Sequence, residues 1–178
     1  MFSDSGAAIY TLGVGSLSRE HLVRWLMCRE VEYVIDTRSP PYAFDRQDFF
    51  PDEFAQFLMA QQMKYLDLHK NLGDRPSDIS LHTGINRIDY RRYLKRTYAI
   101  AGVSRIALAF TMGCRVCVLG REGNPVYAHH ARLIGQALHN KGIGVRHLTH
   151  MGNRLISHKS LIQMIHIQGD SVHFSPPQ

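Results

Sequence analysis

A carboxylate and a guanidinium follow an apolar segment in the motif Asp-Thr-Arg-Ser-Pro-Pro-Tyr at residues 36–42. The apolar run at 31–35 predicts a buried strand, and the two prolines predict that it ends in a loop. Ligands of open α/β sheets bind where the strands end, so Asp36 is a candidate general base, and Arg38 and Tyr42 are candidate ligand-binding residues. The alternative is an ion pair that only holds the loop in place.

A second polar segment, Gly-Arg-Glu-Gly-Asn-Pro at 120–125, follows the apolar run at 115–119. Its guanidinium, on Arg121, is a candidate for binding an anion. Its carboxylate, on Glu122, is a candidate catalytic base. The alternative is a charged turn without a chemical role.

Two adjacent histidines, His129 and His130, fall in a helix that we expect Pro125 to begin. His129 would lie one turn into this helix and face Glu122, where it can donate a proton near neutral pH. His130 would line the same ligand site. A carboxylate neighbour would raise the pKa of His129 above its ordinary value of about 6.5. Two half-exposed histidines with ordinary pKa values are the alternative.

A glycine-rich turn, Gly13-Val14-Gly15-Ser16, ends the first apolar run. Backbone N–H groups of such a turn before a helix suit anions, so Gly13 and Gly15 are candidate ligand-binding residues. The turn lacks the third glycine of the dinucleotide-binding fingerprint. A plain strand-to-helix connection is the alternative.

Four cations share one face of a helix that we expect over residues 89–100, where Asp89 is a suitable N-cap. They are Arg91, Arg92, Lys95 and Arg96. Such a face can contact the phosphates of a nucleic acid, with an affinity that falls as salt increases. A solvated helix face without a partner is the alternative.

The bulk composition is that of one globular domain over residues 1–178, with 44% apolar and 20% charged residues. The net charge of +6 favours an anionic small molecule or a nucleic acid as partner. No apolar run suits a membrane helix, and residues 1–5 lack the features of a secretory signal. Three cysteines make no disulfide framework, so we expect a reducing, cytoplasmic environment. We expect Cys114 and Cys117 to be buried thiols rather than metal ligands, and the residues identify no cofactor.

Apolar runs that alternate with helical patterns predict an α/β fold. We expect a single Rossmann-like domain with about five mostly parallel strands flanked by helices. The strands are expected at 7–14, 31–35, 64–68, 115–119 and 145–148, with a short one near 172–174. The helices are expected at 18–29, from 51, at 89–100, 103–112, 125–140 and 157–165, with a long polar loop at 69–88 and a loose tail at 175–178.

The motifs resemble those of the domain-of-unknown-function 488 family, which comprises small cytoplasmic α/β proteins of bacteria and archaea. Residues 36–42 are similar to the family's Asp-Val-Arg motif, which is followed by Pro and then Tyr or Ser. Tyr90 and Tyr93 match its aromatic helix. The resemblance covers about residues 9–148 and implies an α/β fold with a site at residues 36–42.

A second family motif is only partly present. Glu122 and His129 match its Glu and His, whereas Gly120 and Ala128 stand where the family has cysteines, and His130 stands in place of an Arg. Cysteine-based chemistry is therefore not carried over to this chain.

These features together predict an anion-binding pocket at the carboxyl edge of the sheet. We expect a hydrolase or transferase that acts on a nucleotide- or nucleic-acid-derived substrate. A non-catalytic nucleic-acid-binding module that uses residues 89–100 is the alternative. The sequence indicates neither a metal nor an oligomeric state.

Overall fold

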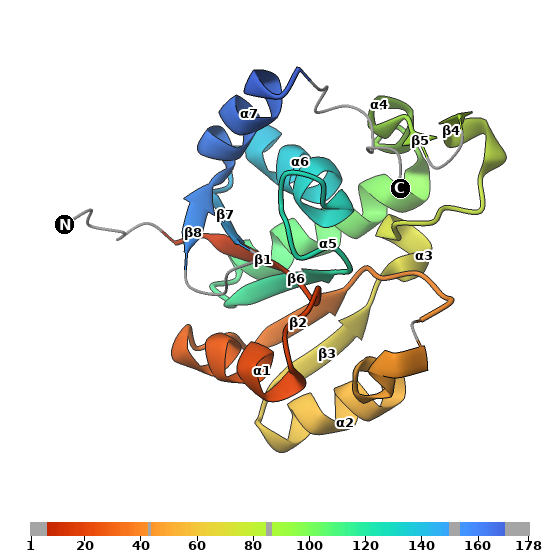
Figure 1. Cartoon of the computed structure of the whole chain (residues 1–178). Coiled ribbons are helices and arrows are strands. Elements are labelled where there is room, and N and C mark those ends of the chain that lie inside the picture. Colours follow the sequence, from red (N-terminus) through yellow and green to blue (C-terminus); the bar gives the residue numbers. More distant parts are fainter. Residues whose placement is uncertain (1–6, 43, 85–86, 150–153, 170–178) are drawn as a thin grey trace.

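Six strands form the central sheet of the computed structural model, which describes residues 7–42, 44–84, 87–149 and 154–169 (Figure 1). Their order is β3-β2-β6-β1-β7-β8, in which five strands are parallel and β8 is antiparallel to β7. The predicted α/β fold with a mostly parallel sheet is confirmed. The strand bounds are β1 (Ile9–Gly13), β2 (Tyr33–Asp36), β3 (Lys64–Asp67), β6 (Val116–Gly120), β7 (Val145–Leu148) and β8 (Leu155–Ser157).

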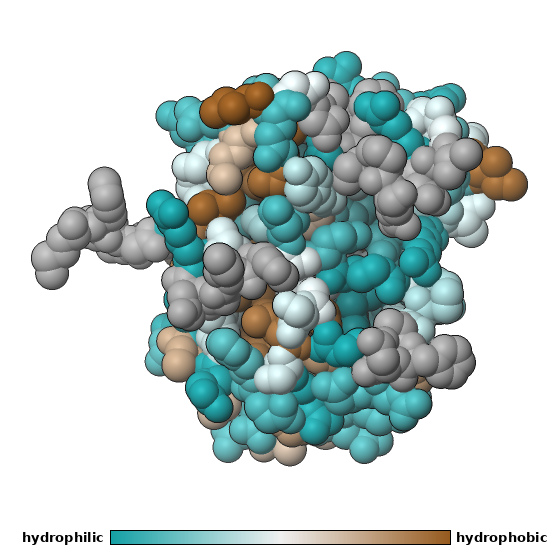
Figure 2. Space-filling model, viewed as in Figure 1, coloured by the Kyte–Doolittle hydropathy of each residue, from teal (hydrophilic) through white to brown (hydrophobic). Residues whose placement is uncertain are grey.

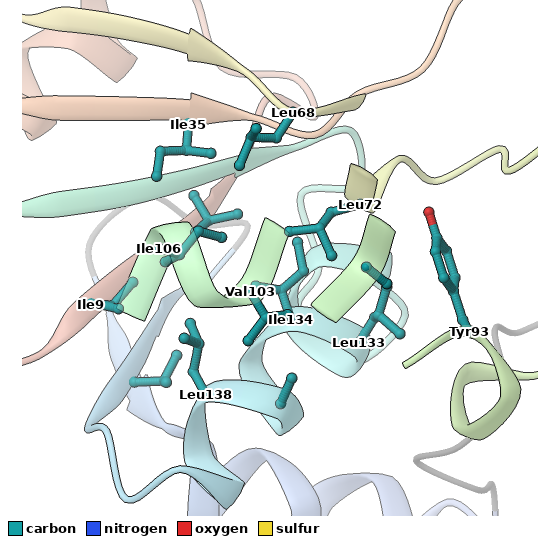
Figure 3. Packing of buried hydrophobic residues seen from close by; sticks show 14 of the residues in the cluster. Ile9, Ile35, Leu68, Leu72, Tyr93, Val103, Ile106, Leu133, Ile134 and Leu138 are labelled. Carbon is teal, nitrogen blue, oxygen red and sulfur yellow. The ribbon is translucent and has the colours of Figure 1, made fainter. Parts of the chain in front are cut away.

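Helices cover both faces of the sheet (Figure 1). One face packs on α1 (Arg19–Cys28) and α2 (Pro51–Ala60), and the other packs on α5 (Thr97–Thr111) and α6 (Gln136–Asn140). Figure 3 shows the second of these cores, in which side chains of β1, β2, α5 and α6 interdigitate. A third, small cluster holds α7 (His158–Ile167).

The central strand β6 shows why the chain forms a sheet with two covered faces. All five of its residues are buried. Val116 and Val118 point into one core, while Cys117 and Leu119 point into the other. Parallel strands buried on both sides read as continuous apolar runs, and this pattern made them predictable.

The expected helix over 89–100 is wrong in its extent. Asp89 caps α4 (Tyr90–Tyr93) through a bond from the N–H of Arg92, as expected, but α4 is a single turn. Arg96 is extended, with φ −75° and ψ 138°, and α5 begins after it. The buried rings of Tyr90 and Tyr93 face the core in α4, so tertiary packing ends the helix there.

Two other expectations need correction. The segment after Pro125 makes turns, and the helix begins only with the π-helix His130–Gly135 that leads into α6. The expected loop 69–88 contains short elements, namely α3 (His69–Leu72), a 3₁₀ turn at Ile79–Leu81 and the hairpin strands β4 (His82–Gly84) and β5 (Arg87–Ile88). A further 3₁₀ segment spans Phe44–Phe49. The strand expected near 172–174 and the tail lie outside the described residues.

The face of the molecule seen in Figure 2 is mostly hydrophilic, with small separate hydrophobic areas. In the described part of the chain, no helix combines the length and the apolar character needed to cross a bilayer. All three cysteines are free thiols. Cys117 is buried as expected, and burial raises its pKa, whereas Cys114 is only half-buried.

Candidate anion-binding site

Three guanidinium groups line a cavity of about 90 Å³ at the carboxyl edge of the sheet. The loops after β1, β2 and β6 supply most of its wall. Four residues predicted from the sequence meet there, and the loop after β2 adds a residue that was not predicted. The lining consists of Val14, Gly15, Arg38, Tyr42, Arg46 and Arg121.

Arg38 reaches the cavity from a buried position. Its side chain is only 5% exposed and forks onto the carboxylate of Asp36, with Nε 3.0 Å from Oδ1 and Nη2 2.5 Å from Oδ2. Nη2 also donates to the carbonyl of Phe49 at 2.9 Å. Burial opposes the charge, but the hydrogen bond and charge of Asp36 raise the pKa of Arg38. The bonds that the described residues make with Arg38 leave both N–H groups of Nη1 uncommitted.

Asp36 lies behind Arg38 rather than on the cavity wall. Both of its oxygens accept bonds from Arg38, and Oδ2 also accepts the hydroxyl of Tyr65 at 2.7 Å. With 1% of its side chain exposed, Asp36 orients the guanidinium of Arg38 and balances its charge. The same contact, together with burial, raises the pKa of Tyr65.

Arg121 is held by groups of two other loops. Its Nε donates to Oδ2 of Asp74 at 2.7 Å, and its Nη2 donates to the carbonyl of Ser39 at 2.5 Å. Its Nη1 lies 3.4 Å from the carbonyl of Pro41, which Arg75 contacts at the same distance. Each terminal nitrogen of Arg121 therefore keeps an N–H group beyond those used in these bonds.

Arg46 completes the cavity from the 3₁₀ segment. Its Nη1 donates to the carbonyl of Gly15 at 2.6 Å, and its Nη2 donates to that of Leu17 at 2.5 Å. The guanidinium stacks on the ring of Phe49 at 4.5 Å. Its Nε lies 3.9 Å from Oδ1 of the partly exposed Asp48. A buried carboxylate thus binds each of Arg38 and Arg121 closely, whereas the carboxylate beside Arg46 is more distant.

The glycine-rich turn has a different role from the expected one. The N–H groups of Val14 and Gly15 donate to the carbonyls of Gly120 and Arg121, each at 2.9 Å, so they are not directed at a ligand. Gly15 lines the cavity, whereas Gly13 does not. A Cβ on Gly13 would lie 1.7 Å from the carbonyl oxygen of Glu122. Gly13 therefore allows the loops after β1 and β6 to touch.

Glu122 lies beside the cavity rather than on its wall. Its Oε2 accepts the backbone N–H of His129 at 3.4 Å. Burial raises the pKa of Glu122, and the negative charge of Asp74 raises it further. Asp74 itself is 6% exposed, and burial opposes its charge, but the hydrogen bond from Arg121 leaves its pKa lowered. The pKa of Glu122 is thus raised, while the pKa of Asp74 is lowered.

The prediction for the ring of His129 is wrong. The ring lies between Tyr90 and Tyr93, at centroid distances of 5.3 and 5.9 Å, and Nε2 donates to the carbonyl of Leu72 at 2.9 Å. Burial lowers its pKa instead of raising it. The error arose because Pro125 does not begin a helix, so the spacing to Glu122 does not place the ring against that carboxylate.

His130 is also buried and lines no part of the cavity. Burial lowers its pKa to about 3, and the neighbouring ring of His129 contributes in the same direction. A Cβ on Gly120 would lie 1.8 Å from Nδ1 of His130. No residue larger than glycine fits at position 120 while His130 keeps this position.

The four predicted cations of the 89–100 segment do not form one continuous helical face. Arg92 donates to the carbonyl of Ser80, and Arg96 binds both the hydroxyl of Ser80 and the carboxylate of Asp78. Arg91, Arg92 and Lys95 are exposed. Two of the four cations, Arg92 and Arg96, therefore connect α4 and the residues after it to the 3₁₀ turn before β4.

Sequence reasoning missed Arg46 and Asp74. Asp74 stands in the Gly-Asp-Arg-Pro turn at 73–76, where a charged pair after β3 signals a loop at the same sheet edge. No local pattern marks Arg46, because its contacts with residues 15–17 arise from the meeting of two loops. Two larger cavities, of about 370 and 270 Å³, lie at the opposite edge, but neither gathers three guanidinium groups.

Searches with this chain found no match among protein-family models, curated proteins or solved structures. Among the described residues, no cluster of three or more His, Cys, Asp or Glu side chains could hold a metal ion.

Proposed function

We propose that this protein binds the anionic group of a small molecule in the cavity between Arg38, Arg46 and Arg121. The single observation that carries the proposal is the convergence of three guanidinium groups on one small space with N–H groups left to donate. Guanidinium groups match the oxygens of phosphate and carboxylate in geometry and charge.

The size of the cavity supports one bound group rather than a whole ligand. Pockets for drug-sized ligands measure about 300–1,000 Å³. The cavity measures about 90 Å³, which suits a single phosphate or carboxylate. The rest of the substrate would extend past Tyr42 and the exposed Arg75 at the rim. A nucleotide or a nucleic-acid-derived phosphate ester has this form.

We further propose that Glu122 is the proton-transfer group of a hydrolase or transferase at this site. Burial and the charge of Asp74 raise the pKa of Glu122, whereas the pKa of Asp74 is lowered, and a carboxyl group with a raised pKa is suited to donate a proton. Asp36 then serves as the positioning residue of Arg38. The resemblance to the domain-of-unknown-function 488 family agrees with this placement of Glu122 and remains part of the proposal.

Calorimetric titration with inorganic phosphate and with a nucleoside monophosphate tests the binding. We expect Arg46→Ala and Arg121→Ala each to weaken binding about tenfold or more, the scale of a lost charge-assisted hydrogen bond. Arg105→Ala, an exposed arginine on the far helix α5, is the matched control and should bind as the unaltered protein does. Absence of binding to either probe would refute the proposal.

The exposure of Arg91, Arg92 and Lys95 favours a second candidate, a nucleic-acid-binding module. It predicts binding to oligonucleotides whose affinity falls steeply with salt. Replacing Arg91, Arg92, Lys95 and Arg96 by Ala should flatten the plot of log affinity against log salt. Unchanged binding in this variant would rule the module out.

A further inference from the structure

A chain of hydrogen bonds crosses the protein interior from the sheet to the last helix. Oγ1 of Thr11 on β1 lies 2.7 Å from Nδ1 of His147 on β7. Nε2 of His147 lies 2.9 Å from Nδ1 of His158, the first residue of α7, and Nε2 of His158 lies 3.2 Å from Oε1 of Gln136. Both rings are buried. The site proposed above uses none of these residues.

All three bonds between Thr11, His147, His158 and Gln136 can form at once only when both imidazole rings are neutral. Nε2 of Gln136 donates to Asn140 at 2.8 Å, so its oxygen accepts the Nε2–H of His158. Nδ1 of His158 then accepts from His147, and Nδ1 of His147 accepts the hydroxyl of Thr11. A proton added to either ring turns both of its nitrogens into donors. One of its hydrogen-bond partners would then face a donor with a donor, so that partner must turn away.

The described residues around the pair offer an added proton no counter-charge. His130 from the π-helix and His139 from α6 act on the two rings, and Arg146 from β7 and Lys159 from α7 line the cavity that His158 also lines. All four are basic. A positive charge at this place is therefore opposed both by burial and by its neighbours.

The rings fit closely against the π-helix. A Cβ on Gly135 would lie 2.9 Å from Cε1 of His147 and 3.0 Å from Nδ1 of His158. This tight packing leaves the rings little room to move apart when one is charged.

Besides this chain of hydrogen bonds, β8 is attached by its pairing with β7, and α7 is attached by a small cluster of its own. Besides His158, the buried residues of α7 are Leu161 and Ile165, which pack in the small third cluster. A small cluster of this kind is the sort of contact that opens locally before the whole domain unfolds.

We propose that the chain Thr11–His147–His158–Gln136 is an acid-sensitive latch that holds β8 and α7 against the sheet at neutral pH and releases them when a proton enters. The partners of α7 in the third cluster include Val126 and Ala128, which lie between Glu122 and His129. Release of α7 therefore exposes Val126 and Ala128, which lie beside the anion site. The latch itself does not depend on the function proposed for that site.

The sign of the effect follows from linkage. Burial lowers the pKa of His158 to about 4, and that of His147 is lowered as well. The docked state thus binds fewer protons than the released state, so docking is fully favoured above the ordinary pKa of about 6.5 and is lost as the pH falls below it. For His158 alone, the docking equilibrium shifts about twentyfold towards release between about pH 7 and pH 5.

Hydrogen exchange at a series of pH values tests the latch. After correction for the intrinsic rate, amides of residues 155–167 should lose protection about twentyfold between about pH 7 and pH 5, while those of 97–111 in α5 stay protected. Equal protection of both segments at every pH would overturn the proposal.

A non-titrating side chain supplies the matched variant. In His158→Gln, the amide can accept from His147 and donate to Gln136, so the part of the pH dependence of α7 that His158 contributes should disappear. His166→Gln removes an exposed histidine of the same helix and should leave the pH dependence intact. Persistence of the full effect in His158→Gln would overturn the latch.

Nitrogen-15 NMR of the unaltered protein provides a test that needs no variant to fold. His147 and His158 should both be neutral single tautomers from about pH 7 to about pH 5.5 while α7 is docked. Titration of either ring near its ordinary pKa with α7 still protected would contradict the proposal.

Discussion

The carboxylate of Asp74 lies 2.7 Å from Nε of Arg121, although 47 residues separate them in the chain. The other oxygen of Asp74 accepts the backbone N–H of Ser39, also at 2.7 Å. One buried carboxylate thus joins the loops that follow β2, β3 and β6. The orientation of Arg121 towards the cavity rests on this connection.

We expect Asp74→Asn to weaken phosphate binding about tenfold and to lower the free energy of unfolding by about 1–3 kcal/mol, because Arg121 loses its charged acceptor. The lowered pKa of Asp74 stabilises the fold above the ordinary pKa of about 3.9, and this contribution is lost as the pH falls through the folded value. The variant should therefore lose less stability on acidification. Urea unfolding at several pH values measures the free energy of unfolding of both proteins. If the variant loses as much stability on acidification as the unaltered protein, the prediction is contradicted.

We expect Asp36→Asn to be more harmful, lowering the free energy of unfolding by about 3–5 kcal/mol, because it leaves the buried guanidinium of Arg38 without its counter-charge. Tyr65→Phe removes only one hydrogen bond to Asp36 and should cost about 1 kcal/mol. Thermal unfolding of both variants distinguishes the two effects. If Asp36→Asn and Tyr65→Phe lower the free energy of unfolding by equal, small amounts, Asp36 does not anchor Arg38.

The sheet was predictable because its central strands are apolar on both faces. β8 was missed because it is a short strand at the edge of the sheet, where Leu155–Ser157 pairs only with β7. The break between α4 and α5 was missed because the buried rings of Tyr90 and Tyr93, rather than helix propensity, decide where the chain turns.

Four of the six residues that line the candidate site could be predicted, because strand ends in a parallel sheet share one edge. This rule placed Gly15, Arg38, Tyr42 and Arg121 together. It could not show that Arg46 joins them, since that contact depends on how two loops fold over each other. Nor could it show that the ring of His129 is buried between aromatic residues 36 and 39 positions earlier.

We expect Gly13→Ala to destabilise the fold by several kcal/mol, on the scale of about 1–3 kcal/mol for overpacking and more where backbone must move. The new Cβ would lie 1.7 Å from the carbonyl oxygen of Glu122, and that oxygen belongs to the backbone. Gly84→Ala is the matched control, because nothing lies within 4 Å of its Cβ position. Similar melting temperatures for the two variants would contradict the close approach of the two loops.

We expect His129 to titrate below its ordinary value of about 6.5, because burial of its ring outweighs the hydrogen bond to Leu72 and the charge of Asp74, which both favour the protonated form. The ring should therefore be neutral at physiological pH and keep a proton on Nε2. NMR titration, assigned with a His129→Gln variant, measures this. A pKa above 6.5 would mean that the ring faces a carboxylate after all.

The most direct test of the anion site is a crystal soaked with tungstate, a tetrahedral oxyanion that scatters X-rays anomalously. The account predicts an anomalous peak in the cavity, within hydrogen-bonding distance of Nη1 of Arg38 and of the guanidinium groups of Arg46 and Arg121. The peak should vanish in Arg46→Ala and persist in Arg105→Ala. An empty cavity at a tungstate concentration that labels other parts of the protein would contradict the account.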